Sequence, residues 1–234
     1  MLPIAIALGL LCVAGERLRP ARPLPSVPGW WPRALLANLA QIGVVLLGGV
    51  AWDHWFGASI FDLGGWPPIA AGALVYLVTT FIYYWWHRAR HHSDRLWLMF
   101  HQIHHSTHRL EAATAFYAHP SDFMANALIV SGVSYVLLGY GLEAAAWTSF
   151  WVGVFDLWEH TNIRTPRWLG YVVVRPEMHR VHHERDRHRS NYGIPIWDML
   201  FGTYENSLRA VDCGFTPAQE GRIFEMLRFR SADR

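Results

Sequence analysis

Five apolar runs, each as long as a membrane helix or slightly shorter, alternate with polar segments along the chain. The runs span residues 1–15, 34–52, 67–86, 123–139 and 142–158. Crossing a bilayer core takes about 20 apolar helical residues, so the second and third runs are predicted to span and the first to form a short membrane helix. The last two runs are barely long enough and flank Gly139-Tyr140-Gly141, which predicts a short membrane hairpin. The pattern indicates an all-α integral membrane protein with about four to five membrane helices.

The polar segments divide the chain into three parts. Residues 1–66 contain the N-terminal membrane helices and a proline- and arginine-rich linker, 16–32, in which the prolines exclude regular helix. Residues 67–206 form the central domain. The tail, 207–234, has a helix start at Thr216-Pro217 followed by interspersed apolar and arginine positions, which predicts an amphipathic segment lying on the bilayer surface.

The distribution of arginine orients the predicted helices. The segment 16–33 has four arginines, and the loop 53–66, which carries His54, has none. Because cytoplasmic loops are enriched in basic residues, the linker is predicted to be cytoplasmic and the loop to lie outside. The third apolar run then ends at an aromatic belt, Tyr83 to Trp86, and returns to the cytoplasm. The two later arginine-rich polar segments are therefore expected to form a cytoplasmic helical cap.

Histidines are clustered in these cap segments and at the end of the third apolar run. Ser93 is a predicted N-cap for a helix from Leu96 to His108, and Pro176 suits the first turn of a helix through His183. On both helices histidines recur at i, i+3 and i+4, which project from one helical face. With an i, i+4 pair just past the aromatic belt, the clustered histidines are His87, His91, His101, His104, His105, His179, His182 and His183.

His160 joins this set, although it stands alone in sequence, because the hairpin returns it to the same side of the membrane. Imidazole is the commonest protein metal ligand at neutral pH, and nine imidazoles suit two ions with four or five ligands each. Solvated helical faces elsewhere in the chain are built from Arg, Asp and Glu, so a merely solvated histidine face is the weaker interpretation. Iron, copper, nickel and zinc all accept such ligands.

A metal-bound imidazole usually hydrogen-bonds through its second nitrogen. The candidates for that role, or for extra ligands, are His108, His119, Asp156, Glu159, Asn162, Asn191 and Asp198. His54 and His188 are expected to take no part, and His92 is expected either to take no part or to support a ligand by a hydrogen bond.

Composition narrows the chemistry. Hydrophobic residues make up 52% of the chain and charged residues 16%, which fits a membrane protein. Two cysteines exclude a disulfide framework and a cysteine-based zinc site. The net charge of +2 and the lack of a recognition motif argue against a nucleic-acid partner. No His-Glu-x-x-His sequence occurs, which excludes the common zinc-protease motif.

In the order and spacing of these motifs, the chain resembles the fatty acid hydroxylase / sterol desaturase superfamily of membrane di-iron oxygenases, in a bacterial-type form. Three histidine blocks appear in that family's order around a hairpin, and their combination is far more specific than any one block. The matching stretches are His87-Arg-Ala-Arg-His91, Leu96-Trp97, His101-Gln-Ile-His104-His105, His119-Pro120, His160-Thr-Asn162, Trp168-Leu169-Gly170, His179-Arg-Val-His182-His183, Asn191-Tyr192-Gly193 and Trp197-Asp198-x-x-Phe201-Gly202-Thr203.

The resemblance implies a catalytic domain over residues 67–206 and two non-haem irons bound by the nine histidines. It implies that dioxygen and two electrons are consumed to hydroxylate or desaturate a C–H bond of a membrane lipid or sterol-like substrate. Zinc can replace iron in such a site. Some relatives have a histidine where this chain has Asp156, and Tyr117-Ala-His119-Pro-Ser-Asp122 departs from a common family motif, so neither an extra ligand nor the lipid's identity carries over.

No flavin or dinucleotide fingerprint is present, so the electrons are expected to come from a separate donor protein. Arginines near the last histidine block are candidates for docking it: Arg180, Arg185, Arg187 and Arg189. The bacterial inner membrane is the expected location, and the oligomeric state is left open. A metal transporter or other metal-binding membrane protein is the alternative, although transporters place their ligands near the bilayer midplane.

Overall fold

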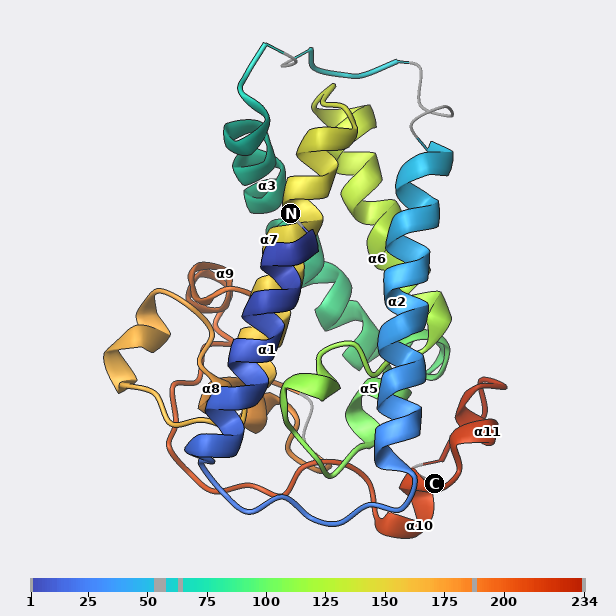
Figure 1. The fold of residues 1–234 in the computed structure, drawn as a ribbon, viewed down its shortest axis with the longest axis vertical. Helices are drawn as coiled ribbons and strands as arrows, with labels where there is room; N and C mark the ends of the chain where they lie inside the picture. The colour runs from blue at the N-terminus through green and yellow to red at the C-terminus, as the bar shows by residue number, and fades with distance from the viewer. Residues whose placement is uncertain (1, 53–57, 63–64, 187–188, 233–234) are drawn as a thin grey trace.

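The computed structural model describes residues 2–52, 58–62, 65–186 and 189–232, and every regular element in these ranges is helical. His54, Arg187 and His188 lie outside the described residues. Five long helices form the body of the molecule (Figure 1). They are α1 (Leu2–Leu18), α2 (Trp30–Trp52), α3 (Pro68–His92), α6 (Pro120–Ser131), which continues as the π-helix η3 (Gly132–Leu137), and α7 (Leu142–His160).

Short helices and long connections gather below this body, at the end where α3 and α7 finish (Figure 1). They are α4 (Asp94–Leu96), the π-helix η1 (Trp97–His101), α5 (Gln102–Ser106), the 3-10 helices η2 (Ala112–Thr114) and η4 (Arg167–Tyr171), α8 (Pro176–His182), α9 (Pro195–Leu200), α10 (Pro217–Glu220) and α11 (Ile223–Met226). We call this lower part the cap.

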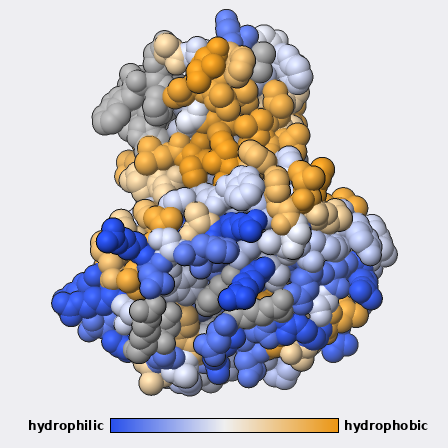
Figure 2. Space-filling view, turned by 180° about the vertical axis from the view of Figure 1, so that it is seen from behind, coloured by the Kyte–Doolittle hydropathy of each residue, from blue (hydrophilic) through white to orange (hydrophobic). Residues whose placement is uncertain are grey.

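Among the described helices, α2 (over Trp30–Gly48) and α3 are long and apolar enough to cross a membrane. Large side chains on α2 point outward, and Leu36 and Leu47 are 68% and 75% exposed. On the face shown in Figure 2, hydrophobic residues cover the upper part of the molecule and hydrophilic residues gather over the cap. This surface fits a protein whose apolar upper part lies in a bilayer and whose polar cap lies in the water on one side of it.

Close packing of α3 against α7 holds the body together. At Gly72 a Cβ atom would lie 2.4 Å from Cβ of Trp147, so only glycine permits the approach. Thr148 donates a hydrogen bond to the carbonyl of Gly72 at 3.0 Å. The turn between η3 and α7 needs glycine as well, because Gly139 has φ +71° and its Cβ would meet the carbonyl oxygen of Phe61 at 2.5 Å.

The helix expected from Leu96 to His108 begins as predicted and then departs from the expectation. The side chain of Ser93 accepts a hydrogen bond from the backbone N–H of Leu96 at 3.4 Å, which confirms the N-cap. The helix then widens into a π-helical turn, with the N–H of Gln102 bonded to the carbonyl of Trp97, and it ends at Ser106. Such turns alter the register of the following side chains. His108 is therefore outside the helix.

The two ends of the chain also differ from expectation. The first helix continues to Leu18, so the linker before α2 is shorter than residues 16–32. The tail forms two short helices rather than one, although Thr216 starts the first with a capping box to Gln219. Met226 is fully buried against Trp30 and Trp97, whereas Phe224 is 73% exposed. The tail thus closes the lower end of α2, and its contact with a bilayer stays a prediction.

Candidate metal centre

The nine histidines singled out in the sequence come together in the cap as two groups. Within each group, one ring nitrogen of every member lies within 4.8 Å of the others. The five-histidine group consists of His87, His91, His101, His105 and His182, and the four-histidine group consists of His104, His160, His179 and His183. This division agrees with the expectation of two ions with four or five ligands each.

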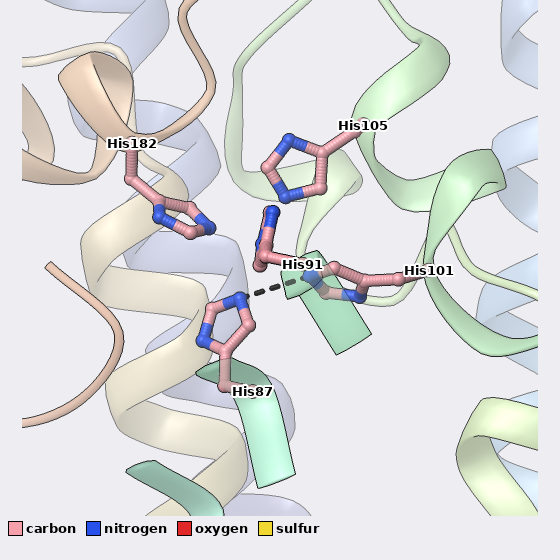
Figure 3. Close-up of side chains that lie close together, drawn as sticks. All are labelled: His87, His91, His101, His105 and His182. Carbon is pink, nitrogen blue, oxygen red and sulfur yellow. Dashed lines mark hydrogen bonds between the residues drawn. The ribbon is translucent and has the colours of Figure 1, made fainter. Parts of the chain in front are cut away.

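Three separate parts of the chain build the five-histidine group (Figure 3). His87 and His91 project from the last two turns of α3, His101 and His105 from η1 and α5, and His182 from α8. Their rings surround a common centre, and Nε2 of His101 lies 2.9 Å from Nε2 of His87.

The four-histidine group is built from α5, α7 and α8, and all of its members are buried. His160 is the last residue of α7, which explains why a histidine alone in the sequence reaches the cluster. Its Nε2 lies 2.9 Å from Nε2 of His179 and 3.3 Å from Nε2 of His104. Nε2 of His183 is 3.0 Å from that of His179.

Each His-x-x-His-His block serves both groups, with the roles exchanged. From the first block, His101 and His105 enter the five-histidine group and His104 the other. From the second, only His182 enters the five-histidine group. At 3.6 residues per turn, adjacent positions diverge by about 100° around the helix axis. The three side chains of a block therefore share one side of the helix but aim at two centres, a division that the spacing within one block does not specify.

Backbone carbonyls orient several of these rings. Nδ1 of His87 donates to the carbonyl of Tyr192 at 2.8 Å, Nδ1 of His182 to that of Ser190 at 2.7 Å, and Nδ1 of His160 to that of Asp156 at 2.6 Å. A carbonyl only accepts, so in each ring the proton is on Nδ1 and the lone pair is on Nε2. In all three, the ring nitrogen left for a metal is Nε2.

Carboxylates face two further rings. Oε1 of Glu159 lies 3.4 Å from Nδ1 of His179, and Oδ2 of Asp122 lies 3.7 Å from Nδ1 of His101. A proton on Nδ1 of His179, facing Glu159, would leave the Nε2 atoms of His179 and His160 presenting two lone pairs to each other at 2.9 Å. Such lone pairs repel unless a cation binds both. Nitrogen ligands about 2.1 Å from an ion are separated by about 3 Å when they subtend a right angle, so the donor set fits a metal ion.

Burial keeps the cap imidazoles neutral. Burial lowers the pKa well below the ordinary value for His101, His104, His105, His179 and His183. Repulsion between neighbouring imidazoles, were they protonated, lowers it further, and at His101 and His104 the charge of Arg90 adds to this effect. Neutral imidazole is the form that binds metals. The centre is therefore set to accept cations without first releasing protons.

A cavity of about 150 Å³ opens beside both groups. Its histidine end is formed by His87, His101, His104, His160 and His179, and its walls come mainly from α3, α6 and α7. Most of the remaining wall is aromatic or aliphatic, with Tyr76, Phe116, Phe123, Val152, Phe155 and Ile194. A hydrocarbon chain entering from the apolar band would meet the histidines at the end of this cavity.

Two histidines predicted as possible ligands belong to neither group. His108 lies with its Nδ1 2.5 Å from Oε2 of Glu220, which is also paired with Arg33 at 3.3 Å. His119 caps α6, where its ring accepts from the N–H of Ser121. In the described residues neither ring contributes a ligand atom to the two groups, because the helix ends before His108 and the ring of His119 faces Ser121 and Leu227. Their role as extra ligands or supporting groups stays a prediction.

Three other predicted partners, Asp198, Asn191 and Asn162, form hydrogen bonds with the surrounding backbone and side chains rather than with the imidazole rings. Asp198 accepts from the backbone N–H groups of Tyr192 and Gly193 and so holds the loop whose carbonyl orients His87. Burial raises the pKa of Asp198 to about 6. Asn191 bonds to the carbonyls of Met178 and Glu205. Asn162 joins Arg180 to the carbonyl of Arg22.

Several contacts to the rings could not have been anticipated from residue types. The carbonyls of Tyr192 and Ser190 carry no sequence signal, because every residue has one. Asp122, which faces His101, pairs with the buried Arg90 at 2.5 Å. Its signals in the sequence were its place in the segment from Tyr117 to Asp122 and its charge directly before an apolar run. Arg180, expected at a docking surface, is 93% buried, since its exposure is 7%.

Comparisons with known proteins agree with this geometry. The family model described as fatty acid hydroxylase matches residues 72–203. Alkylglycerol monooxygenase of Homo sapiens is 28% identical over 180 residues, which cover 69% of this chain and 36% of the relative. Alkylglycerol monooxygenase of Danio rerio is 30% identical over 71% of this chain and 33% of the relative. A very-long-chain aldehyde decarbonylase of Oryza sativa subsp. japonica is 25% identical over 54% of this chain and 22% of its own length.

This chain thus spans about a third of the length, or less, of these relatives. No solved structure matches it significantly.

Proposed function

Because this chain belongs to the fatty acid hydroxylase family, we propose that it is a membrane-bound di-iron oxygenase that hydroxylates a C–H bond of a lipid. The observation that carries the proposal is the convergence of nine imidazoles, in groups of five and four, at the end of a largely apolar cavity. Iron bound by such ligands would activate dioxygen for attack on an unactivated C–H bond. Imidazole also withstands oxidation better than thiolate.

The balanced reaction consumes dioxygen, two electrons and two protons. One oxygen atom enters the C–H bond as a hydroxyl group, and the other leaves as water. The chain's own residues bind the ions, keep the imidazoles neutral and present an apolar wall that excludes water. The two electrons come from a separate donor protein. The relatives named as monooxygenases favour oxygen insertion over desaturation.

The proposed arrangement has four to five membrane helices above a cytoplasmic cap in a bacterial inner membrane. Three of the arginines before and within α2 support this orientation, because they contact the cap: Arg17 pairs with Glu111, Arg22 bonds to the carbonyl of Val211, and Arg33 pairs with Glu220. The arginine-rich end and the histidine end of the molecule therefore coincide. A transporter is less well supported, because the ligands lie at the ends of α3 and α7.

Lipid mass spectrometry under ¹⁸O₂ tests the proposal. Cells producing the wild-type protein are compared with cells producing His104→Ala and with cells producing His92→Ala, an exposed neighbour outside both groups. We expect a lipid carrying one ¹⁸O atom in the wild type and the His92→Ala variant, and its loss in His104→Ala. A lipid that loses two hydrogens without gaining the label would indicate desaturation instead. Full oxidation in His104→Ala would contradict the proposal.

A further inference from the structure

The polar side chains of the cavity wall carry information about the substrate beyond the reaction type. Apart from histidines and tyrosines, four ionisable residues line the cavity, and three of them are acidic: Arg90, Asp122, Asp156 and Glu159. Arg90 and Asp122 are paired with each other at 2.5 Å, and Arg90 also lies over the ring of Trp86. Glu159 faces Nδ1 of His179. Three of the four therefore already have partners.

Asp156 differs from these three. It lies one turn before His160 on α7, and its backbone carbonyl orients that ring, but its carboxylate oxygens make no hydrogen bond or salt bridge to any described residue. The carboxylate is also absent from both groups of converging ligand atoms found in the described chain. A carboxylate enclosed by a lipid in this cavity is costly unless something donates a hydrogen bond to it.

A second unpaired acceptor lines the same cavity. Gln41 projects from the membrane helix α2, and its Oε1 is buried without a hydrogen-bond partner among the described residues. Polar groups inside membrane helices are expensive and tend to face functional cavities. Both groups can accept hydrogen bonds, so a ligand that donates hydrogen bonds would satisfy them.

We propose that Asp156 is a substrate-binding residue whose carboxylate accepts a hydrogen bond from a hydroxyl group of a neutral lipid. This inference rests on the proposed function for the reaction, and it adds the class of substrate. An anionic head group would face Asp156 and Glu159, while a pure hydrocarbon would bury the carboxylate of Asp156 unsatisfied. A hydroxyl-bearing head group satisfies Asp156 and leaves the hydrocarbon against the aromatic wall, beside the four-histidine group.

The test is equilibrium binding to the full-length, metal-loaded protein without oxygen. Four lipids of equal chain length serve as probes: a primary alcohol, its methyl ether, the carboxylic acid and the amine. A hydrogen bond to a charged group changes affinity by about tenfold or more, so we expect the alcohol to bind at least about tenfold more tightly than the methyl ether. Asp156→Leu should bring that ratio close to one, and Asp156→Asn should give an intermediate ratio.

Glu143→Gln is the matched control, because Glu143 is an exposed acid in the first turn of the same helix. It should leave the ratio unchanged. If Asp156→Leu does not fold, the ratio in Asp156→Asn decides. The proposal is overturned if the wild type binds the ether, the acid or the amine as tightly as the alcohol, or if both variants keep the wild-type ratio. Loss of metal in Asp156→Asn would likewise overturn it, since the carboxylate would then be a ligand.

Binding and turnover separate this inference from the proposed function. The predicted binding ratios without any ¹⁸O incorporation would support the hydroxyl-binding role and contradict the oxygenase. Incorporation into lipids that bind without regard to a hydroxyl group would support the oxygenase and contradict the role of Asp156.

Discussion

The five-histidine group and the four-histidine group are built from the same two sequence blocks, yet they differ in their surroundings. Two histidines of the five-histidine group come from α3. The rings of His87 and His182 donate hydrogen bonds to carbonyls of the loop between α8 and α9. The four-histidine group depends on α7, which supplies His160 and also carries Glu159 and Asp156 near the group. One group is thus oriented largely by a polar loop, the other by the membrane helix that forms the cavity wall.

The difference in ligand number has a chemical consequence. Transition-metal ions such as iron accept up to six ligands. An ion bound by four imidazoles would therefore keep one more open coordination position than an ion bound by five. Of the residues that line the cavity, His104, His160 and His179 belong to the four-histidine group. The four-histidine group has Glu159 and Asp156 on its own helix α7, whereas Asp122 faces His101 of the five-histidine group. Ions bound by the two groups would therefore have different surroundings, and the following variants test this difference.

The largest expected effect is the loss of a ligand. His160→Ala leaves three imidazoles in its group, whereas His182→Ala leaves four, the number that the other group has naturally. We expect both variants to lose lipid oxidation, and His160→Ala to lose more iron, because affinity falls with each ligand removed. Iron measured per purified chain, with His92→Ala as control, checks this. Equal iron loss in the two variants would mean that the groups are equivalent.

A smaller effect is expected when a ring loses the carboxylate that faces it. Glu159→Gln replaces the carboxyl group that lies 3.4 Å from Nδ1 of His179 with an amide. Such partners typically contribute about 10- to 100-fold to metal affinity, so we expect a weakening of that order for one of the two ions. Metal titration with two resolvable sites measures it, with Glu143→Gln as the matched control on the same helix. Weakening of both sites alike would count against separate surroundings.

The loop that supports the five-histidine group can be weakened separately. Asp198→Asn loses an acceptor for the backbone N–H groups of Tyr192 and Gly193. Leaving one buried N–H unsatisfied costs roughly 2 kcal/mol, or about 4–8 °C in Tm for a protein of this size. We expect that loss of stability together with a modest weakening of one metal site. Thermal unfolding with and without metal distinguishes the two effects, and an unchanged Tm would show that the loop does not need Asp198.

The smallest effect on the metal centre is expected at His108. In His108→Ala the buried Glu220 keeps Arg33 but loses its contact with the imidazole. Iron content and lipid oxidation should match the wild type, while Tm falls by a few degrees because a hydrogen bond to a charged group is lost. Iron analysis and thermal unfolding of the same preparation are sufficient. Loss of iron would show that His108 binds a metal after all.

The sequence by itself determined the helical class, the approximate limits of the apolar helices and the nine histidines that converge. The helices and eight of the histidines follow from local periodicity, because apolar runs of membrane length and imidazoles at i, i+3 and i+4 project in directions that a helix dictates. His160 follows from the predicted hairpin, which returns it to the same side of the membrane. The cap at Ser93 and the helix start at Pro176 were predictable for the same reason.

Tertiary structure alone decided how the histidines divide and what holds them. The exchange of roles between the two blocks depends on where α3, α7 and α8 meet, and the partners of His87 and His182 are backbone carbonyls that no residue type reveals. The π-helical turn at Trp97–His101 and the two-part tail arise from packing as well. His108 shows the limit most clearly. It continues the histidine pattern of the first block, yet the helix ends at Ser106 and Glu220 binds the ring.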